Sequence, residues 1–221
     1  MFIDIFLNVL KDIWPMIFIF SVIVVSCRVF YLISNNEKVV FYKEILMFCF
    51  IIYILLLYYI VTFQDNNYGT NNLVPFKEIF RYSISSKYFF KNVVGNIALF
   101  IPFGIFVTYY MKNKKIIITF TLSLIVSAAI EFAQNAIGRT VDIDDVILNV
   151  VGGLLGYYVF KIIGMISDKM PSFFRSQLFL DGFCLIMILV LIYLAYKVNF
   201  WRFLAWIILM FLMNMVKILK V

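Results

Sequence analysis

Histidine is absent from this chain of 221 residues, and cysteine, proline and charged residues are scarce. The lack of histidine removes the commonest general base, the usual catalytic triads and every His-containing metal site. The three cysteines, Cys27, Cys49 and Cys184, lie in separate apolar runs without metal-ligand spacing, so we expect small buried thiols. Any chemistry must therefore rest on carboxylates, amides, Arg, Lys, Tyr or Ser.

Low charge is matched by an excess of apolar residues. Charged residues make up 14% of the sequence and hydrophobic residues 65%, whereas soluble domains contain roughly 45–50% apolar residues. A soluble protein of this size could not bury so many apolar side chains, so the sequence predicts an integral membrane protein. Residues 1–12 show no signal-peptide cleavage pattern and are interpreted as an amphipathic lead-in to the first span.

The apolar runs provide about seven segments of spanning length, at roughly 20 residues each. They are Ile13–Ile33, Ile45–Phe63, Val93–Met111, Ile116–Ile137, Val146–Ile166 and the long stretch Gly182–Val216, which the cluster Lys197, Asn199 and Arg202 divides into a hairpin. We therefore expect an all-α polytopic transmembrane bundle. Its expected parts are residues 1–44 with the first span, a four-span core over 45–166, and a C-terminal extension over 167–221 containing the hairpin.

Basic residues are unevenly distributed between the two ends of the predicted spans. The side opposite residue 1 collects eleven basic and four acidic residues, whereas the side of residue 1 collects eight of each. Because cytoplasmic loops are enriched in Lys and Arg, this bias predicts an outside N terminus and a cytoplasmic C terminus.

The loop Gln64–Asn92 is one of two segments that break the apolar pattern. After Pro75, the residues Phe76, Ile79, Phe80 and Ser83 recur at helical spacing, with Lys77, Arg81 and Lys87 among them. The pattern favours either an interfacial helix that attracts anionic headgroups or a connecting helix whose charges are merely solvated. The sequence leaves both interpretations open.

The second polar segment begins on the fourth predicted span. Glu131, Gln134 and Asn135 have spacing i, i+3, i+4 and should share one helix face near its outer end. A carboxylate at the bilayer centre costs on the order of 2.5–3.5 kcal/mol, and less nearer the edge. Glu131 should therefore face the bundle interior and find a partner or a proton, with Arg139 the nearest candidate in sequence.

The fifth predicted span begins with a comparable polar stripe. Asp142, Asp145 and Asn149 fall on one face, with Asp144 on the other, and glycines at 152, 153 and 156 continue the stripe. The pair Gly152 and Gly156 forms a GxxxG motif that allows close helix approach. Asn96 on the third span, followed by Phe100, Pro102 and Gly104, is a plausible partner.

Together these residues predict one outward-facing polar pocket. Its candidate members are Asn96, Glu131, Gln134, Arg139, Asp142, Asp145 and Asn149, with Asp142 and Asp145 as candidate Mg²⁺ ligands. A structural interpretation stands beside the functional one. Asp142 suits a helix N-cap, and Asn96 and Asn149 suit interhelical hydrogen bonds. Glu131 is the residue that this interpretation explains least.

The same residues carry a family resemblance. The ordered set Asn96-x3-Phe100-x-Pro102-x-Gly104, Glu131-x2-Gln134 and Arg139-x2-Asp142-x-Asp144-Asp145-x3-Asn149-x2-Gly152-x3-Gly156 resembles the VanZ-like family pattern, as does Asn72-Leu73-Val74-Pro75-Phe76. The likeness covers about residues 45–163. It implies a multi-pass protein of the bacterial plasma membrane associated with teicoplanin resistance, which is a location and a process rather than a reaction.

Four functions remain in competition. The pocket could bind an anionic lipid or a polyprenyl-linked wall precursor, with Arg139, Lys91 or Mg²⁺ meeting the phosphate. It could instead be an enzyme site, with Glu131 as general base beside Mg²⁺. A transporter would need polar residues along whole spans, and the inner halves of spans three to five are expected to be almost wholly apolar. A scaffold would need only the GxxxG surface. No nucleic-acid-binding signature is present, and the oligomeric state is not indicated.

Overall fold

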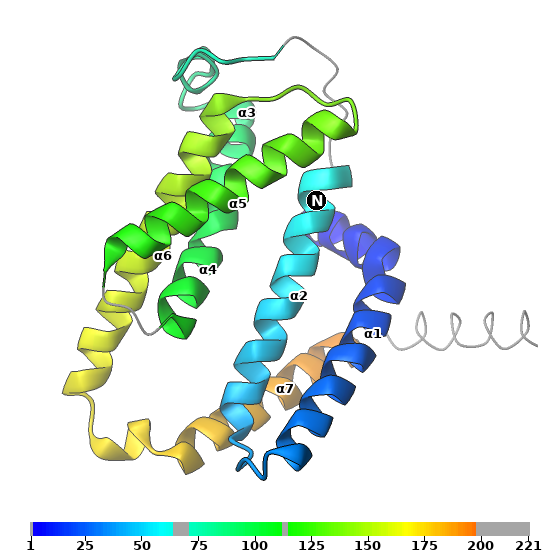
Figure 1. The fold of residues 1–221 in the computed structure, drawn as a ribbon, viewed down its shortest axis with the longest axis vertical. Helices are drawn as coiled ribbons and strands as arrows, with labels where there is room; N and C mark the ends of the chain where they lie inside the picture. Colours follow the sequence, from blue (N-terminus) through cyan, green and yellow to red (C-terminus); the bar gives the residue numbers. More distant parts are fainter. Residues whose placement is uncertain (1, 64–70, 112–114, 198–221) are drawn as a thin grey trace, which may run out of the picture. The chain divides into compact units, whose positions relative to one another are not determined.

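The computed structural model describes residues 2–63, 71–111 and 115–197 (Figure 1). These residues form helices and connecting turns without a strand, as the all-α prediction requires. The chain divides into two compact units. One comprises Met1–Glu37 and Leu46–Met170, and the other comprises Lys38–Ile45 and Pro171–Val221. All of the candidate pocket residues belong to the first unit.

Within the described residues, five helices are long and apolar enough to cross a membrane, by length and composition. These spans are Pro15–Ser34 in α1 (Phe2–Ser34), Phe41–Ile60 in α2 (Phe41–Phe63), Lys87–Tyr110, Ile116–Ala136 and Ile143–Lys169. They correspond to the first five predicted spans. The predicted lead-in continues into the first span as one helix, α1.

The second unit contains η3 (Ser172–Arg175) and α7 (Gln177–Lys197). The α7 helix covers the start of the predicted hairpin, and the rest of that hairpin lies outside the described residues. The total of seven spans therefore stays a prediction. Within this unit the backbone N–H of Tyr42, at the start of α2, donates to the Asp181 carboxylate of α7 at 2.8 Å.

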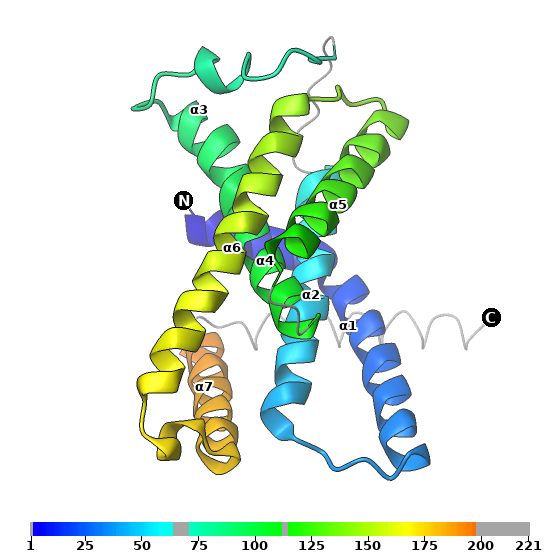
Figure 2. The same ribbon diagram turned by 60° about the vertical axis from the view of Figure 1, so that its left-hand side comes forward.

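The third predicted span is built from three consecutive pieces. A short α3 (Lys87–Phe89) leads through the π-helical turn η2 (Phe90–Val94) into α4 (Gly95–Tyr110). Together with α5 (Ile116–Ala136) and α6 (Ile143–Lys169), α4 forms a three-helix group in both views (Figures 1 and 2). Among the contacts of α6, those with α4 are the most extensive.

Glycine permits the close approach of α4 and α6. A Cβ atom at Gly152 would overlap the carbonyl oxygen of Ile97, and one at Gly156 would overlap that of Ile101. From the other side, a Cβ atom at Gly104 would overlap the carbonyl oxygen of Gly153. Only a helix face without side chains allows backbones this close, so the prediction from the GxxxG motif is confirmed.

The α2 helix packs against this group through an apolar core. Leu57 of α2 is buried with Phe100, Phe103 and Val107 of α4. The Tyr53 hydroxyl of α2 donates to the carbonyl oxygen of Leu99 at 2.7 Å, so the polar tip of this ring is satisfied within the apolar surroundings.

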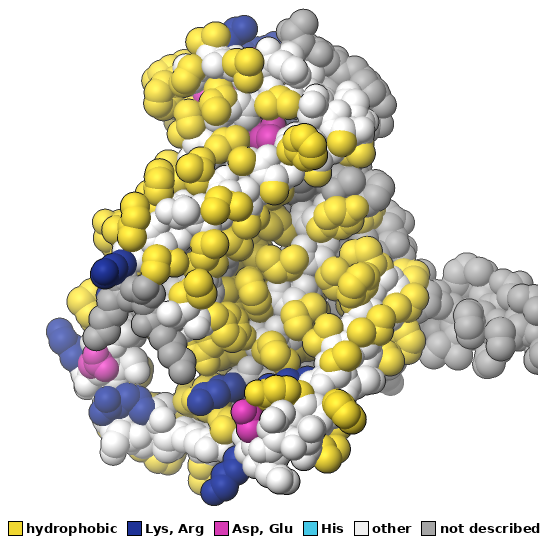
Figure 3. Space-filling model, viewed as in Figure 1, with side chains coloured by type: hydrophobic (Ala, Val, Ile, Leu, Met, Phe, Trp, Pro, Cys, Tyr) yellow, Lys and Arg dark blue, Asp and Glu magenta, His cyan; other side chains and the backbone are white. Residues whose placement is uncertain are grey.

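Hydrophobic side chains cover most of the helix surface in the space-filling view (Figure 3). Such exposure is expected where helices face lipid rather than water. Two of the cysteines belong to this surface, because Cys27 and Cys49 are exposed free thiols and Cys184 is half-buried. The expectation that these thiols are buried within the protein is therefore wrong for Cys27 and Cys49.

Candidate functional site

The end of α5 is fixed by a glycine turn that places Arg139. Gly138 has φ +82°, a left-handed conformation that favours glycine. The N–H of Gly138 donates to the carbonyl of Asn135 at 3.0 Å, and the N–H of Arg139 donates to that of Gln134 at 3.0 Å. This pair of bonds is a Schellman motif, which satisfies the last carbonyls of α5 and turns Arg139 back beside the helix end.

Glu131 of α5 is linked to the start of α6. Its side chain is only 4% exposed, and its Oε2 accepts the backbone N–H of Asp142 at 2.9 Å. Asp142 is the N-cap of α6, because its Oδ1 accepts the backbone N–H of Asp144 at 2.9 Å. The N-cap interpretation of Asp142 is therefore confirmed, and Glu131 faces the bundle interior as predicted.

Asp145 of α6 is linked to α4. The Asn96 side-chain amide donates to the Asp145 carboxylate, which joins the two helices at the level of Glu131. Asp145 interacts electrostatically with both Glu131 and Asp142, and the guanidinium of Arg139 interacts with Glu131 and Asp145. We call Asn96, Glu131, Arg139, Asp142 and Asp145 the carboxylate cluster.

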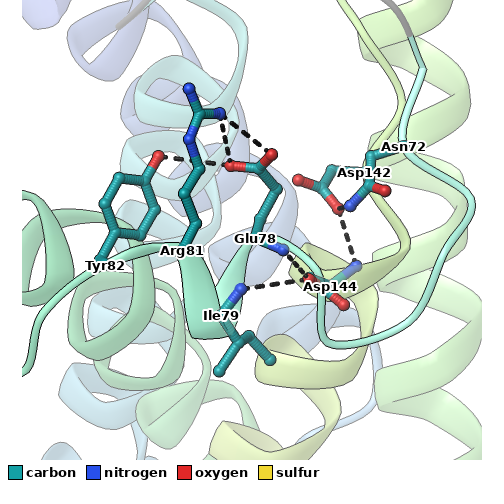
Figure 4. Close-up of polar contacts among 7 residues, drawn as sticks. All are labelled: Asn72, Glu78, Ile79, Arg81, Tyr82, Asp142 and Asp144. Atoms are coloured by element: carbon teal, nitrogen blue, oxygen red, sulfur yellow. Dashed lines mark hydrogen bonds and ion pairs between the residues drawn. The ribbon is translucent and has the colours of Figure 1, made fainter.

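Asp144 has a role that the sequence did not predict. Although expected to point away from the polar stripe, it is only 1% exposed. Its carboxylate accepts the backbone N–H group of Phe76. It also accepts the backbone N–H groups of Glu78 and Ile79, at 2.7 and 3.2 Å (Figure 4). This buried carboxyl group thus exchanges contacts with water for three backbone amide donors. Asp144 fixes the loop before α3 to the start of α6.

Asn72 makes the second attachment of that loop. Its backbone N–H donates to the carbonyl of Val141 at 2.9 Å, and its own carbonyl accepts the N–H of Ile143 at 3.0 Å, so Asn72 and Asp142 form an isolated parallel β-bridge. The Asn72 side-chain amide also donates to Asp142 Oδ1 at 2.9 Å (Figure 4). Sequence reasoning missed this residue, although its segment contributed to the family resemblance.

The predicted helix after Pro75 does not form. The structure instead contains the three-residue 3-10 helix η1 (Ile79–Arg81), and Phe76 adopts a left-handed backbone with φ +67°. The reason lies in Asp144, because one carboxylate that binds three N–H groups from residues 76 to 79 bends the backbone around itself. The prediction of an amphipathic helix is therefore wrong, while the exposed apolar and basic side chains remain.

The remaining predicted residues divide into buried and exposed. Gln134 is buried, and Asn149 is buried where its amide donates to Ser127 Oγ at 2.9 Å. Asn135, expected to share the face of Glu131, is exposed. Asn149 thus joins α5 to α6 below the carboxylate cluster, as the structural interpretation proposed, and it does not reach the carboxylates through a direct bond in the described structure.

A buried polar stripe continues along α5 beyond the cluster. Thr119, Ser123, Ser127 and Glu131 recur every four residues, and all are buried. The Thr119 and Thr108 hydroxyls lie 3.2 Å apart, and Ser123 Oγ has no hydrogen-bond partner within the described residues. The expectation of an almost wholly apolar inner half is therefore wrong for α5, and its hydroxyl residues were the overlooked signal.

The cluster offers acceptor oxygens and one nearby guanidinium. Burial raises the pKa of the Asp142 carboxyl above its ordinary value. The N–H of Asp144 and the amide of Asn72 oppose this, while the charges of Asp144 and Glu78 add to it. Among the described residues, no group of three or more Asp, Glu or Cys side chains is arranged to hold a metal ion. Mg²⁺ usually uses one or two carboxylates together with phosphates and water, so Mg²⁺ at Asp142 and Asp145 stays a prediction.

Comparisons with known proteins match the part of the chain that contains this site. The family model described as VanZ/LLP1 matches residues 50–164, just over half of the chain. Protein VanZ of Enterococcus faecium is 32% identical over 114 residues, which cover 50% of this chain and 68% of that protein. No solved structure matches the chain. All residues of the carboxylate cluster lie inside the matched range.

Proposed function

Because the chain belongs to the VanZ/LLP1 family, we propose that it acts in the plasma membrane of a bacterial cell and contributes to glycopeptide (teicoplanin) resistance. The carboxylate cluster is its functional site, and it opens toward the outer face. The ligand is an anionic lipid headgroup or a polyprenyl-linked wall precursor, and its binding alters access of the antibiotic to the wall.

The observation that carries this proposal is the burial of Glu131 within a span. A carboxylate in this position is costly, and such groups are functional by default in membrane proteins. Asp142 has a sufficient structural role as an N-cap, and Asn149 has one as an interhelical bond. Glu131 has a backbone partner but still adds a third acid beside Asp142 and Asp145, which a purely structural site does not require.

A phosphate-bearing ligand needs a cation, because carboxylates alone repel it. Arg139 can supply a bidentate guanidinium, and a Mg²⁺ ion shared between ligand phosphate and Asp145 would supply the rest. Binding of a labelled lipid precursor to the purified protein should therefore weaken in Arg139→Ala and on removal of Mg²⁺ by a chelator. Binding that is unaffected by both changes would contradict the phosphate model.

The charge of the cluster can be tested without disturbing its hydrogen bonds. In Glu131→Gln the new amide oxygen can still accept the N–H of Asp142, and in Asp145→Asn it can still accept from Asn96. We expect the wild type to raise the inhibitory concentration of teicoplanin for a sensitive bacterial host. In both variants most of this increase should be lost, and their affinity for the ligand should fall by about tenfold or more, which corresponds to about 1.4 kcal/mol.

Asp168→Asn is the matched control, because Asp168 is exposed near the other end of α6. It should protect as well as the wild type at equal membrane expression. Equal protection by all four proteins would show that the cluster is structural. A wild type that gives no protection would remove the resistance proposal and leave the binding assay as the test of the site.

Proton movement along α5 is a second candidate function. The buried hydroxyl residues Thr119, Ser123 and Ser127 continue from Glu131 along the span, so polar groups are available for much of its length. When an inward proton gradient is imposed, proteoliposomes carrying an internal pH indicator should then acidify faster with wild type than with Glu131→Gln or Ser127→Ala. If wild-type vesicles acidify no faster than empty vesicles, the stripe serves helix packing alone.

A further inference from the structure

The loop between α2 and α3 exposes apolar side chains outside every span. Leu73 is 70%, Phe80 81% and Ile84 74% exposed, and Val74 and Phe76 are exposed as well. On a span, lipid covers such groups, but a loop in water would leave them hydrated. Burying a side chain of this size is favourable by about 1.5–3 kcal/mol, so their joint exposure requires an explanation.

The backbone of this loop is held in place rather than left free. Asp144 binds the N–H groups of Phe76, Glu78 and Ile79, and Asn72 is paired with Asp142. Phe76 adopts φ +67°, a conformation that costs a residue with a side chain about 1–2 kcal/mol. The result is a fixed turn on which the Phe76 and Phe80 rings lie 6.3 Å apart between their centroids.

Basic residues accompany the exposed apolar ones. Residues 71–91 contain four basic side chains, Lys77, Arg81, Lys87 and Lys91, and one acidic side chain, Glu78, which gives a net charge of +3. Arg81 is neutralised locally, because Glu78 accepts two hydrogen bonds from it at 3.1 Å (Figure 4). Lys77 and Lys87 are both exposed beside the apolar side chains.

We propose that residues 73–84 form a membrane anchor that lies in the headgroup region of the leaflet next to the carboxylate cluster. Leu73, Val74, Phe76, Phe80 and Ile84 insert to the level of the upper acyl chains. Lys77 and Lys87 bind the phosphates of anionic phospholipids, with their aliphatic stems along the apolar side chains. This inference concerns a separate surface and does not depend on the ligand proposed for the cluster.

Lipid is the occupant that the geometry favours. The loop connects the end of α2 to the start of α3, so both of its ends are already at the bilayer boundary. Its mixture of aromatic, aliphatic and basic side chains matches the composition of that boundary, with apolar material below and anionic phosphate above. The hydrogen bonds from the loop backbone to the Asp144 carboxylate then have a role in membrane contact, because they fix which side chains face the bilayer.

Depth measurement by spin labelling tests the anchor in the full chain. The three native cysteines are replaced by Ser, a single nitroxide is placed at Phe80→Cys or Ser85→Cys, and each protein is put into nanodiscs of phosphatidylcholine with or without phosphatidylglycerol. We expect the label at 80 to be shielded from a water-soluble nickel reagent and accessible to oxygen, while the label at 85 remains accessible to nickel. Ile84→Cys should repeat the result for residue 80.

The contribution of the two lysine charges is tested with the double variant Lys77→Gln/Lys87→Gln. Phosphatidylglycerol should reduce nickel access at residue 80 further, and this additional reduction should be lost in the double variant. Equal nickel access at residues 80 and 85 would contradict the membrane anchor. Shielding that disappears when each nanodisc holds one protein copy would also contradict it, because a second copy of the chain would then be the partner. Glu131→Gln should leave the depth unchanged, so failure of the proposed function and failure of the anchor are distinguishable.

Discussion

At the scale of single residues, Asp144 has the clearest structural role. An amide cannot replace its carboxylate, because an asparagine side chain would keep one acceptor oxygen and turn two N–H hydrogens toward amides that are themselves donors. A donor left unpaired costs about 1–3 kcal/mol when it is fully buried, and these three amides are part-buried. We expect Asp144→Asn to accelerate hydrogen exchange at the amides of residues 76, 78 and 79 by about tenfold or more per donor lost, measured by mass spectrometry in detergent.

Asp168→Asn is the control for this exchange experiment as well, since it makes the same chemical change at an exposed position of α6. It should leave exchange in the loop at the wild-type rate. Unchanged exchange in Asp144→Asn would mean that the three amides are protected by something other than the carboxylate, and that Asp144 does not fix the loop.

Asp142 gives a residue-scale prediction for pH. Because its folded pKa is raised, chiefly by burial, the folded state binds this proton more tightly than the unfolded state. Its contribution to stability is therefore full below the unfolded pKa of about 3.9 and is lost as the pH rises through the folded pKa. An asparagine at this position keeps an acceptor oxygen for Asn72 and the Asp144 N–H but cannot ionise.

The stability of Asp142→Asn relative to the wild type should thus increase as the pH is raised from about 4 toward 7. Thermal unfolding of both proteins in the same detergent, measured at several pH values, checks this slope. A difference that stays constant across the range, or that falls with rising pH, would contradict the assignment of a raised pKa to Asp142.

Single residues also show which parts of the site were predictable. Glu131 could be found because a carboxylate in an apolar run must face inward, and Asp145 because helical spacing places it near that acid. Asp144 and Asn72 could not be assigned, because their partners are backbone amides and carbonyls far away in sequence. Such partners leave no periodic pattern, and the helical spacing of Asp144 pointed to the wrong face.

At the scale of elements, the close crossing of α4 and α6 depends on glycine at defined positions. Alanine in place of Gly156 would put its Cβ atom onto the carbonyl of Ile101, and alanine in place of Gly104 would put one onto that of Gly153. Both contacts are with backbone, which cannot move as the tip of a flexible side chain can. We expect each substitution to destabilise the protein by about 1–3 kcal/mol through overpacking, seen as a lower unfolding temperature.

Gly164 of α6 provides the comparison within the same helix, since nothing lies within 4 Å of a Cβ atom built there. Gly164→Ala should be as stable as the wild type or slightly more so, because Ala is the better helix former. If Gly156→Ala proved as stable as Gly164→Ala, the crossing would be looser than described. The same contacts bear on the scaffold hypothesis, because the GxxxG face is already occupied by α4 of the same chain.

Element boundaries followed from the sequence wherever apolar length determined them. The starts and ends of the second, fourth and fifth spans lie within a few residues of the predicted ones, because each span ends where charges or Gly138 begin. The conformation of the loop after Pro75 could not be predicted in this way. Its side chains have helical spacing, but the tertiary contact with Asp144 determines the backbone instead. Hydroxyl residues on α5 were interpreted as part of an apolar run, yet they line its buried face.

At the scale of the whole molecule, the distribution of charge predicts which end of the spans faces the cytoplasm. The eleven basic and four acidic residues of one side make it strongly positive, whereas the eight and eight of the other side cancel. The positive side includes Lys169 and Arg175, while the carboxylate cluster and the loop before α3 are on the neutral side. The positive-inside rule therefore predicts that the cluster faces the outside, where a wall precursor or an antibiotic would meet it.

Two matched serine substitutions test this orientation in intact cells. Ser85 lies in the loop beside the cluster, Ser172 lies in η3, which the charge count assigns to the positive side, and both are exposed. In a background with the native cysteines replaced by Ser, Ser85→Cys should react with a membrane-impermeant maleimide in whole cells, and Ser172→Cys only after permeabilisation. The reverse pattern would turn the cluster toward the cytoplasm, so its ligand would then have to be a cytoplasmic lipid headgroup or a precursor before export.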